Sequence, residues 1–517
     1  MKPRSSILAA AAILALAVAV ALRFPELPLR PLHHDEAINA LKFAELLETG
    51  RYVYDPEEYH GPLLYYLTLA AAKLSGATTF EAIDEWTLRC VPALLGSLLV
   101  VLMPPFAQGL GRGAAVAAMF FFAVSPAFTY YSRDYIHEIY FVFFSALAIL
   151  AGWRYYLNRH AWWFFLAGAS LAAMQTTKET YLIAMTVMGL ATLMTMAWDR
   201  YRPVPRPREA ESKPLPVGVL VGTLATAFLI SLLLYSSFFR NPRGVLDSLA
   251  ALLFYFQRTG ATSLHDQPWY YYLAILGFTK NLGAPVWSEA FLLALALFGM
   301  GIAFLSRSGD ENTPLARFLA LYSLATFLIY SGLRYKTPWL ALNFHFGFIL
   351  LAAAAVAWLW RRARRKGLRM ALAALLAAGT LHLAWQSWQL NFKYPASRRH
   401  PYVYAQTVPD LLNLVQRIAE VAAHSPDGRS TPIAVISPEY WPLPFYLRAY
   451  DRVGYWHSPP AADLAAPIYI TSLVFAQKLE SRLGDGYHQE YFGLRPDVPL
   501  LLYVRNDLWA AMLEARR

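Results

Sequence analysis

Residues 338–366 read PWLALNFHFGFILLAAAAVAWLWRRARRK, a long apolar run followed directly by a basic cluster. A helix that crosses a bilayer core of ~30 Å needs about 20 apolar residues, and basic residues collect on its cytoplasmic side. The rest of the chain has the same character, since 57% of its 517 residues are hydrophobic and 15% are charged, with a mean hydropathy of +0.34. The composition therefore excludes an ordinary soluble protein and predicts a multi-pass membrane protein.

Eleven apolar runs predict membrane-spanning helices, although the runs near 161 and 316 are short. They cover residues 6–22, 89–110, 113–130, 139–156, 161–175, 180–197, 217–238, 286–305, 316–332, 338–360 and 371–388. The first run is typical of a signal peptide, but no plausible mature start follows it, so we expect a retained signal anchor. The predicted fold class is an α-helical polytopic membrane protein with a C-terminal extracytoplasmic α/β domain.

The short loops between these runs predict the orientation of the chain. With the N-terminus inside, every strongly basic loop lies inside, including the Pro-rich linker 202–216 and the cluster 361–366. The formal net charge of +11 therefore reflects topology and does not indicate a nucleic-acid partner. An odd number of spans then places the C-terminal domain outside, at a plasma (inner) membrane.

Two parts of the chain outside the spans have predicted structure of their own. The first outer loop, 23–88, contains two apolar helical segments, 36–48 and 63–74, which are too short to span and are expected to lie along the interface. The tail contains short apolar strands near 432–436, 468–470 and 500–504, with helices over 403–423 and 473–482. We therefore divide the chain into a membrane module, 1–388, and an α/β domain, 389–517.

The motif His33-His34-Asp35-Glu36 directly follows the first predicted span. Two adjacent carboxylates beside histidines could supply a general base or help to bind a divalent cation. The alternative is structural, with Asp35 as the N-cap of the next helix and Glu36 favouring the helix dipole. Capping leaves the two histidines unexplained, so the two interpretations have equal weight.

A second polar segment, residues 131–138, follows the third predicted span. If this segment is helical, Asp134, His137 and Glu138 share one face, next to Arg133. That face could hold a metal ion or position an acceptor. Spacing alone favours the alternative, a solvated helix end with an internal Asp–His contact.

Cations also occur in later outer loops, at Lys178 beside Glu179 and at Arg334 and Lys336. Orientation does not explain them, because they oppose the positive-inside trend. A phosphate group does, since arginine offers a bidentate fork and lysine a point charge. Snorkelling to headgroups is the alternative, but for Arg334 with Lys336 we favour phosphate binding. His345 lies within a span and is interpreted as a hydrogen-bonded packing residue.

The order of these motifs resembles the GT-C glycosyltransferases, membrane enzymes that use lipid-phosphate-linked sugars. The chain is most similar to the dolichyl-phosphate-mannose–protein mannosyltransferase and aminoarabinose transferase branch, and more narrowly to prokaryotic flippase-activity-associated proteins of the Agl type. The resemblance covers essentially the whole chain. It is carried by His33-His34-Asp35-Glu36, Tyr59-His60-Gly61-Pro62-Leu63, Tyr131-Ser132-Arg133-Asp134, Lys178-Glu179, Arg334-Tyr335-Lys336-Thr337-Pro338-Trp339 and Trp441-Pro442-Leu443-Pro444-Phe445-Tyr446.

The resemblance implies roles for particular residues. An acid of the first outer loop acts at the acceptor, which corresponds to Asp35 with Glu36 beside it. A second acidic position corresponds to Asp134 or Glu138. Basic residues of the outer loops hold the lipid phosphate, and the matching candidates are Arg133, Lys178, Arg334 and Lys336. Further site candidates are His33, His34, His60, His137 and Glu179. The histidine pair and the α/β tail, in place of a β-trefoil, depart from the family and leave the acceptor and cofactor open, with Mg²⁺ or Mn²⁺ as candidates.

The predicted activity is inverting transfer of a sugar from a polyprenyl-phosphate donor to an extracytoplasmic protein, lipid or glycan. Asp35 would deprotonate the acceptor, and the departing phosphate would be stabilised by cations. The rival prediction is a flippase, or a flippase partner, for lipid-linked sugars. A transporter places ionisable groups near the bilayer midplane, often within inverted repeats. Here the charges gather at one face, which favours an enzyme.

Overall fold

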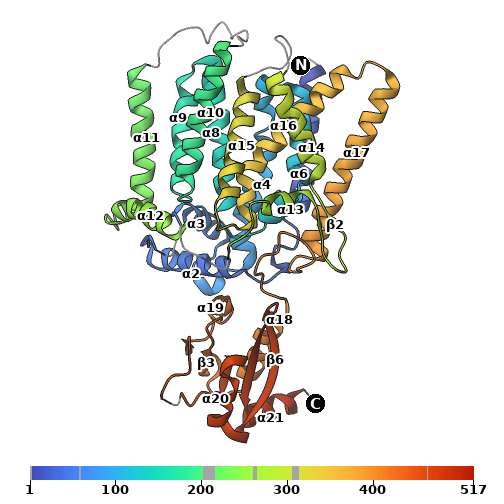
Figure 1. Cartoon of the computed structure of the whole chain (residues 1–517). Helices are drawn as coiled ribbons and strands as arrows, with labels where there is room; N and C mark the ends of the chain where they lie inside the picture. Colours follow the sequence, from blue (N-terminus) through green and yellow to red (C-terminus); the bar gives the residue numbers. More distant parts are fainter. Residues whose placement is uncertain are drawn as a thin grey trace.

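The computed structural model describes residues 3–516 except 58–59, 202–215, 260–264, 306–313 and 463. Most of the inner linker predicted at 202–216 lies outside the described residues, as does Tyr59 of the motif quoted above. Figure 1 shows a bundle of long helices with a small domain at one end, opposite the end at which the N-terminus lies. Helices α2, α3, α12 and α13 lie between the bundle and this domain.

Each predicted span corresponds to a helix of the bundle. These helices are α1 (Pro3–Arg23), α4 (Glu85–Val101), α6 (Arg112–Val124), α8 (Glu138–Asn158), α9 (Ala161–Gln175), α10 (Tyr181–Tyr201), α11 (Val217–Tyr235), α14 (Ala290–Leu305), α15 (Pro314–Gly332), α16 (Leu342–Arg362) and α17 (Lys366–Trp388). Within the described residues, 8 helical segments are long and apolar enough to cross a membrane. The polytopic helical fold is therefore confirmed, while α6, α9 and α14 are shorter and the count of eleven spans stays a prediction.

Helix α16 is the central element of the bundle. It belongs to the apolar span Pro338–Arg362, and 94% of the most apolar stretch of this span is buried inside the protein. Gly299 of α14 lies so close to α16 that an added Cβ would overlap the carbonyl of Leu351. Small residues allow such close helix approach within membranes, where van der Waals contact rather than hydrophobic burial drives packing. The apolar stretch at residues 338–360 is thus the core of the membrane module.

Short helices join the spans at the end of the bundle that faces the C-terminal domain. They are α2 (His34–Thr49), α3 (Leu63–Ser75), α7 (Pro126–Tyr131), α12 (Gly244–Thr259) and α13 (Tyr271–Gly277). The helices predicted at 36–48 and 63–74 are confirmed as α2 and α3. The N-cap of α2 is His33, whose ring accepts a hydrogen bond from the Asp35 amide while Glu36 accepts one from the His33 amide. The alternative in which Asp35 is the N-cap is therefore wrong.

The C-terminal domain is built on a five-stranded sheet with the order β4-β3-β5-β7-β6. Its strands are β3 (Ile433–Ile436), β4 (Val453–Trp456), β5 (Ile468–Ser472), β6 (Tyr487–Arg495) and β7 (Val498–Arg505). Strand β3 is parallel to β4 and β5, whereas β7 is antiparallel to β5 and β6. Helices α18 (Asp410–Ala423) and α21 (Asn506–Ala515) share a core with one face, and α20 (Leu473–Leu483) shares one with the other.

The predicted helix at 403–423 is partly wrong, because α18 begins only at Asp410. The residue before a proline is restricted to extended conformations, and Pro409 sets this boundary. Residues 403–409 instead run along the first outer loop, where the Gln406 amide donates to the Pro31 carbonyl and Thr407 to the Leu32 carbonyl. The prediction also missed β4, β6 and α21.

Candidate active site

Glu36 is enclosed at the junction of the first outer loop and the bundle. Its side chain is fully buried, and both oxygens bind Arg89 of α4, at 2.7 and 2.6 Å. The amides of His33 and Tyr135 complete its hydrogen bonds. Burial opposes ionisation of Glu36, but the Arg89 charge outweighs it and lowers the pKa to about 2. Glu36 therefore holds the loop in place, with Arg89 in turn binding the carbonyls of residues 27, 30 and 31.

Asp35 lies outside the buried ion pair of its neighbour. Its side chain is 45% exposed, and its nearest ionisable partner, the His33 Nδ1, lies 4.0 Å from the carboxylate. Because that nitrogen accepts a hydrogen bond from the Asp35 amide, it carries no proton toward the carboxylate. Among the described residues, no cation or N–H lies within hydrogen-bond distance of the Asp35 carboxylate. Asp35 is thus free to accept a proton from a ligand.

His33 and His34 support this position in different ways. The Nε2 of His33 lies 3.0 Å from the Tyr404 carbonyl and donates to it, since Nδ1 is the acceptor. The ring of His34 lies against Trp441, with 5.9 Å between ring centroids. Burial lowers the pKa of His34 to about 4, so the ring is neutral at physiological pH. Both histidines therefore connect the Asp35 loop to the linker and the C-terminal domain.

The segment 131–138 is not a continuous helix, which corrects the expected single face of Asp134, His137 and Glu138. Helix α7 ends at Tyr131 and α8 begins at Glu138. Asp134 forms a buried ion pair with Arg30, and Glu138 forms another with Lys178. Their side chains are 9% and 2% exposed. Both acids are thus paired with separate cations, and Asp134 also lines a small hollow together with His33 and Tyr404.

Arg133 also has a structural role in the described chain. Its guanidinium donates to the carbonyls of Arg23, Pro25 and Glu26 and lies over the ring of Phe392. Arg133 and Lys178 were phosphate candidates, but each is engaged within the protein. Arg133 holds the first outer loop against the end of the bundle, and Lys178 pairs with Glu138 at the start of α8, so we do not assign either to the donor.

His60 and Glu179 form a second polar pair beside α3. The His60 Nδ1 donates to the Glu179 carboxylate at 2.6 Å, and the Tyr54 hydroxyl donates to its other oxygen at 3.1 Å. Burial raises the pKa of Glu179, but the positive potential and hydrogen bond of His60 outweigh burial and lower it. The His60 ring stacks edge-on against His137, which is buried. The structure thus brings together three residues that the sequence placed in separate loops.

Gly61 explains how this pair is assembled. Its amide donates to the Thr177 carbonyl and that of Leu63 to the Thr176 carbonyl. A Cβ at Gly61 would overlap the Thr176 carbonyl, so only glycine permits this contact. The motif at residues 60–62 therefore docks the first outer loop on the turn that carries Lys178 and Glu179.

Arg334 and Lys336 lie on a loop that pairs with residues 265–267. Arg334 is 62% exposed and forms an ion pair with Asp266 at 2.8 Å. Lys336 is buried, and its ammonium donates to the Gln267 and Leu333 carbonyls. Burial lowers the pKa of Lys336. The two cations therefore differ: Arg334 faces open solvent, whereas Lys336 stabilises the loop.

Tyr404 and His265 connect the Arg334 loop to Asp35. The Tyr404 hydroxyl contacts His265 Nδ1, and the His265 ring stacks on Tyr335. Burial lowers the pKa of His265 and raises that of Tyr404, and both groups lie close enough to Asp35 for its charge to act on them in the raising direction. The contact between Tyr404 and His265 thus lies close both to Asp35 and to the loop that carries Arg334.

The acids at this site do not fit a divalent cation held by Asp35 and Glu36. Both Glu36 oxygens are saturated by Arg89 and backbone amides, so they cannot turn toward Asp35. No group of three His, Cys, Asp or Glu side chains in the described part of the chain has metal-binding geometry. We therefore derive no step through a metal ion.

Sequence reasoning identified the acids but missed their partners. Arg89 and Arg30 each neutralise one acid, and Tyr404 and His265 border Asp35. Arg89 did carry a signal, because it lies at the start of a predicted span where an unpaired charge is costly. His345 was interpreted as a packing residue, and its Nε2 lies 2.9 Å from Glu289 in a buried pair.

Comparison of the whole chain with solved structures defines its class. ArnT from Cupriavidus metallidurans in the apo state superposes with a TM-score of 0.62 at 15% identity, over 96% of this chain and 98% of that chain. The archaeal oligosaccharyltransferase AglB from Archaeoglobus fulgidus, in complex with an inhibitory peptide and a dolichol-phosphate, gives 0.60 at 14% identity over 100% and 78%. The chain therefore has the GT-C fold, and it is a multi-pass membrane protein.

A family match adds detail to this class. Residues 62–242 match the family described as dolichyl-phosphate-mannose-protein mannosyltransferase, which confirms the resemblance to the mannosyltransferase and ArnT branch. The match includes Asp134, Glu138 and Lys178 but ends before Arg334 and begins after Asp35. No curated protein matches the chain.

Proposed function

We propose that this protein is an inverting membrane glycosyltransferase that moves a sugar from a polyprenyl phosphate to a hydroxyl acceptor on the extracytoplasmic side. One observation carries the proposal: of the four candidate acids, Asp35 alone keeps an exposed carboxylate, while Glu36, Asp134 and Glu138 each bind a buried cation. A general base must reach the proton that it abstracts, and Asp35 meets this condition. The site also lies beside the open Arg334.

The lipid carrier is supported by the relatives. Crystals of ArnT from Cupriavidus metallidurans contain undecaprenyl phosphate, and AglB contains a dolichol-phosphate. Arg334 is the described site cation with an open guanidinium, and its exposed pair with Asp266 is of the weak kind that an incoming phosphate can displace. A charged fork binds phosphate oxygens bidentately. Arg334 would therefore neutralise the leaving phosphate.

The chemistry follows from these two positions. The Asp35 carboxylate removes the proton of an acceptor hydroxyl as the oxygen attacks the anomeric carbon. The bond from that carbon to the phosphate oxygen breaks, and the polyprenyl phosphate leaves as an anion beside Arg334. A phosphate is already a good leaving group, so its side of the reaction requires stabilisation of charge rather than a strong acid.

The test is Asp35→Asn in the purified full-length protein, assayed with polyprenyl-phosphate sugars. Loss of a general base slows a reaction by about 10²–10⁴-fold, so transfer should collapse while donor binding and melting temperature stay unchanged. Asp507→Asn is a control, because Asp507 is likewise the second residue of its helix, α21, and its exposed carboxylate pairs with Arg505 in the C-terminal domain. In the same assay, Arg334→Gln should weaken donor binding.

Two results would contradict the proposal. Transfer by Asp35→Asn at the wild-type rate would show that Asp35 is not the general base. Movement of a labelled lipid-linked sugar across proteoliposomes, without any transfer in wild-type protein, would support transport instead.

A further inference from the structure

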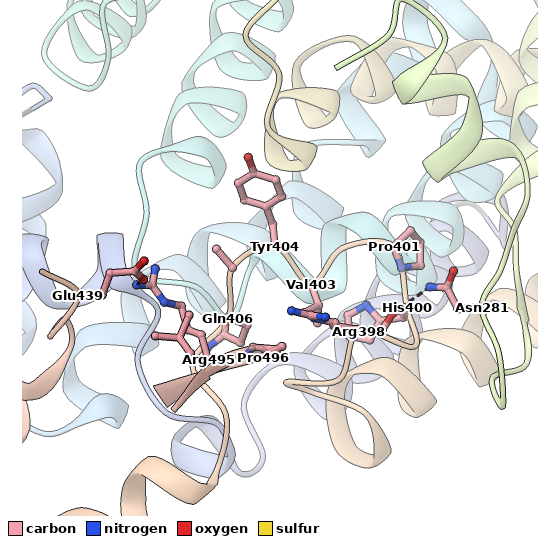
Figure 2. Close-up of a pocket in the computed structure, with 12 residues that line it drawn as sticks. Asn281, Arg398, His400, Pro401, Val403, Tyr404, Gln406, Glu439, Arg495 and Pro496 are labelled. Atoms are coloured by element: carbon pink, nitrogen blue, oxygen red, sulfur yellow. Dashed lines mark hydrogen bonds and ion pairs between the residues drawn. The ribbon is translucent and has the colours of Figure 1, made fainter. Parts of the chain in front are cut away.

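A cavity of about 480 Å³ lies between the linker and the C-terminal domain (Figure 2). Its walls come from residues 398–406 of the linker, the turn between β6 and β7, Glu439 and Asn281. We propose that this cavity binds the acceptor, and that the acceptor is a neutral oligosaccharide. The inference rests on the proposed transfer reaction and adds to it the acceptor class. Specific small-molecule sites have volumes of about 300–1,000 Å³, so two or three sugar rings are a reasonable occupant.

Arg495 is the central polar group of this cavity. A bulge between Gly493 and Arg495 interrupts the pairing of β6 with β7, and bulges redirect side chains at the ends of strands. Arg495 forms an ion pair with Glu439 across the cavity wall, while its buried Nε has no hydrogen-bond partner among the described residues. An unpaired buried donor is costly, so a ligand oxygen at this point would be favourable.

A second ion pair joins Arg398, which lines the cavity, to Asp497, which lies in the turn between β6 and β7 next to the lining residues Pro496 and Val498. Arg398 and Asp497 form an exposed ion pair at 2.7 Å, and the Asn281 side chain donates to the Arg398 carbonyl at 2.8 Å. His400 is 1% exposed, and its ring packs against Tyr130 and Trp287. Burial lowers the pKa of His400 to about 3, so its neutral ring can both donate and accept.

The arrangement of charges selects among acceptor classes. Each arginine is paired with a carboxylate, at Arg495–Glu439 and Arg398–Asp497. The carboxylates would repel an anionic ligand, and the arginines would repel a cationic ligand. Sugar hydroxyls donate and accept together, so a neutral carbohydrate can bind both Arg495 and Glu439, and Arg398 in the same wall. A lipid chain would instead leave these polar groups without partners.

The cavity adjoins Asp35 through Tyr404. Tyr404 lines the cavity and also a smaller hollow that includes His33 and Trp339. Figure 2 shows its ring standing between Glu439 with Arg495 on one side and Pro401 on the other. Arg495 is also near enough to His34 to lower its pKa, after the larger influence of burial. A bound glycan could therefore pass one hydroxyl beyond Tyr404 toward Asp35.

Isothermal titration of the full-length protein in detergent tests this inference. Mannotriose, maltotriose and chitotriose are the neutral probes, with a serine-containing hexapeptide and trigalacturonate as comparison ligands. At least one neutral trisaccharide should bind saturably, and Arg495→Gln and Glu439→Gln should each raise its Kd by about tenfold or more. Arg452→Gln is the control, because Arg452 is exposed in the same domain and does not line the cavity.

The outcomes separate this inference from the proposed reaction. Asp35→Asn should still bind the trisaccharide saturably while transfer is lost, since Asp35 is not in the cavity wall. If transfer depends on Asp35 but no neutral glycan binds, the cavity assignment is wrong and the reaction stands. Tighter binding of the peptide, or an unchanged Kd in folded Arg495→Gln, would also overturn it. Glycan binding without any sugar transfer would support the cavity assignment and contradict the proposed transfer reaction.

Discussion

Asp35 and Glu36 are neighbours with the same charge, yet the structure gives them opposite environments. They occupy the second and third positions of α2, so their side chains point about 100° apart around the helix. Sequence analysis recognised the acidic pair but could not divide its roles. The reason is that the partner of Glu36, Arg89, lies 53 residues further along the chain. Tertiary pairing, not local pattern, leaves Asp35 available.

Glu36→Gln should therefore lower stability, where Asp35→Asn does not. Removing one partner of a buried ion pair strands the Arg89 charge and costs about 3–5 kcal/mol. The measurement is the melting temperature in detergent, and Asp35→Asn is the matched control one residue away. The pKa of Glu36 falls from 4.5 to about 2 on folding, so the wild-type advantage exists above pH 4.5 and is lost as pH falls toward 2. Equal melting of Glu36→Gln and wild type at pH 7 would refute the structural role.

At the level of the elements, the turn at residues 60–62 makes a tertiary contact that its local sequence motif does not predict. The sequence identified His60-Gly61-Pro62 and Lys178-Glu179 as separate clusters. It could not show that they meet, because the backbone hydrogen bonds that join them connect positions over 100 residues apart. The long helices were easier, since an apolar run of fixed length is a local property. Residues 403–409 were mistaken for helix because Pro409 had been included within the run.

Gly61→Ala should break this contact between loops. The new Cβ overlaps the Thr176 carbonyl, and overpacking of this kind costs about 1–3 kcal/mol. The variant should melt earlier and should expose His60 to a faster reaction with diethyl pyrocarbonate. Gly152→Ala is the control, because that glycine lies in α8 with open space around its Cα. A melting curve identical to that of the control would show that the turn accommodates the new Cβ with no loss of stability.

In the whole molecule, the C-terminal domain is fastened directly to the loop that carries Asp35. The Tyr446 hydroxyl accepts a hydrogen bond from the Leu32 amide at 2.8 Å and donates to Glu85 at 2.9 Å. Arg448 donates to the carbonyls of Phe80 and Ile83. The α/β tail was predicted from its strands, but these anchors depend on single side chains that no periodicity marks.

Tyr446→Phe should loosen this attachment while keeping the ring. Loss of the hydroxyl leaves the Leu32 amide without its acceptor, and a hydrogen bond of about 1 kcal/mol corresponds to several-fold faster exchange. Hydrogen–deuterium exchange should rise in the peptide covering residues 27–36, in full-length protein. Tyr491→Phe provides the control, because Tyr491 is 65% exposed on the far strand β6. Unchanged exchange at Leu32 would mean that other contacts carry the attachment.

The linker of residues 398–409 binds the Asp35 loop along one part of its length and lines the cavity along another. The residues proposed to carry out the transfer and the surface proposed to select the acceptor thus lie on different stretches of chain, which this linker connects. Substitutions in the C-terminal domain would then change the acceptor selectivity without altering the residues of the reaction. Such a division of labour would let one helical scaffold serve many glycan structures across diverging lineages.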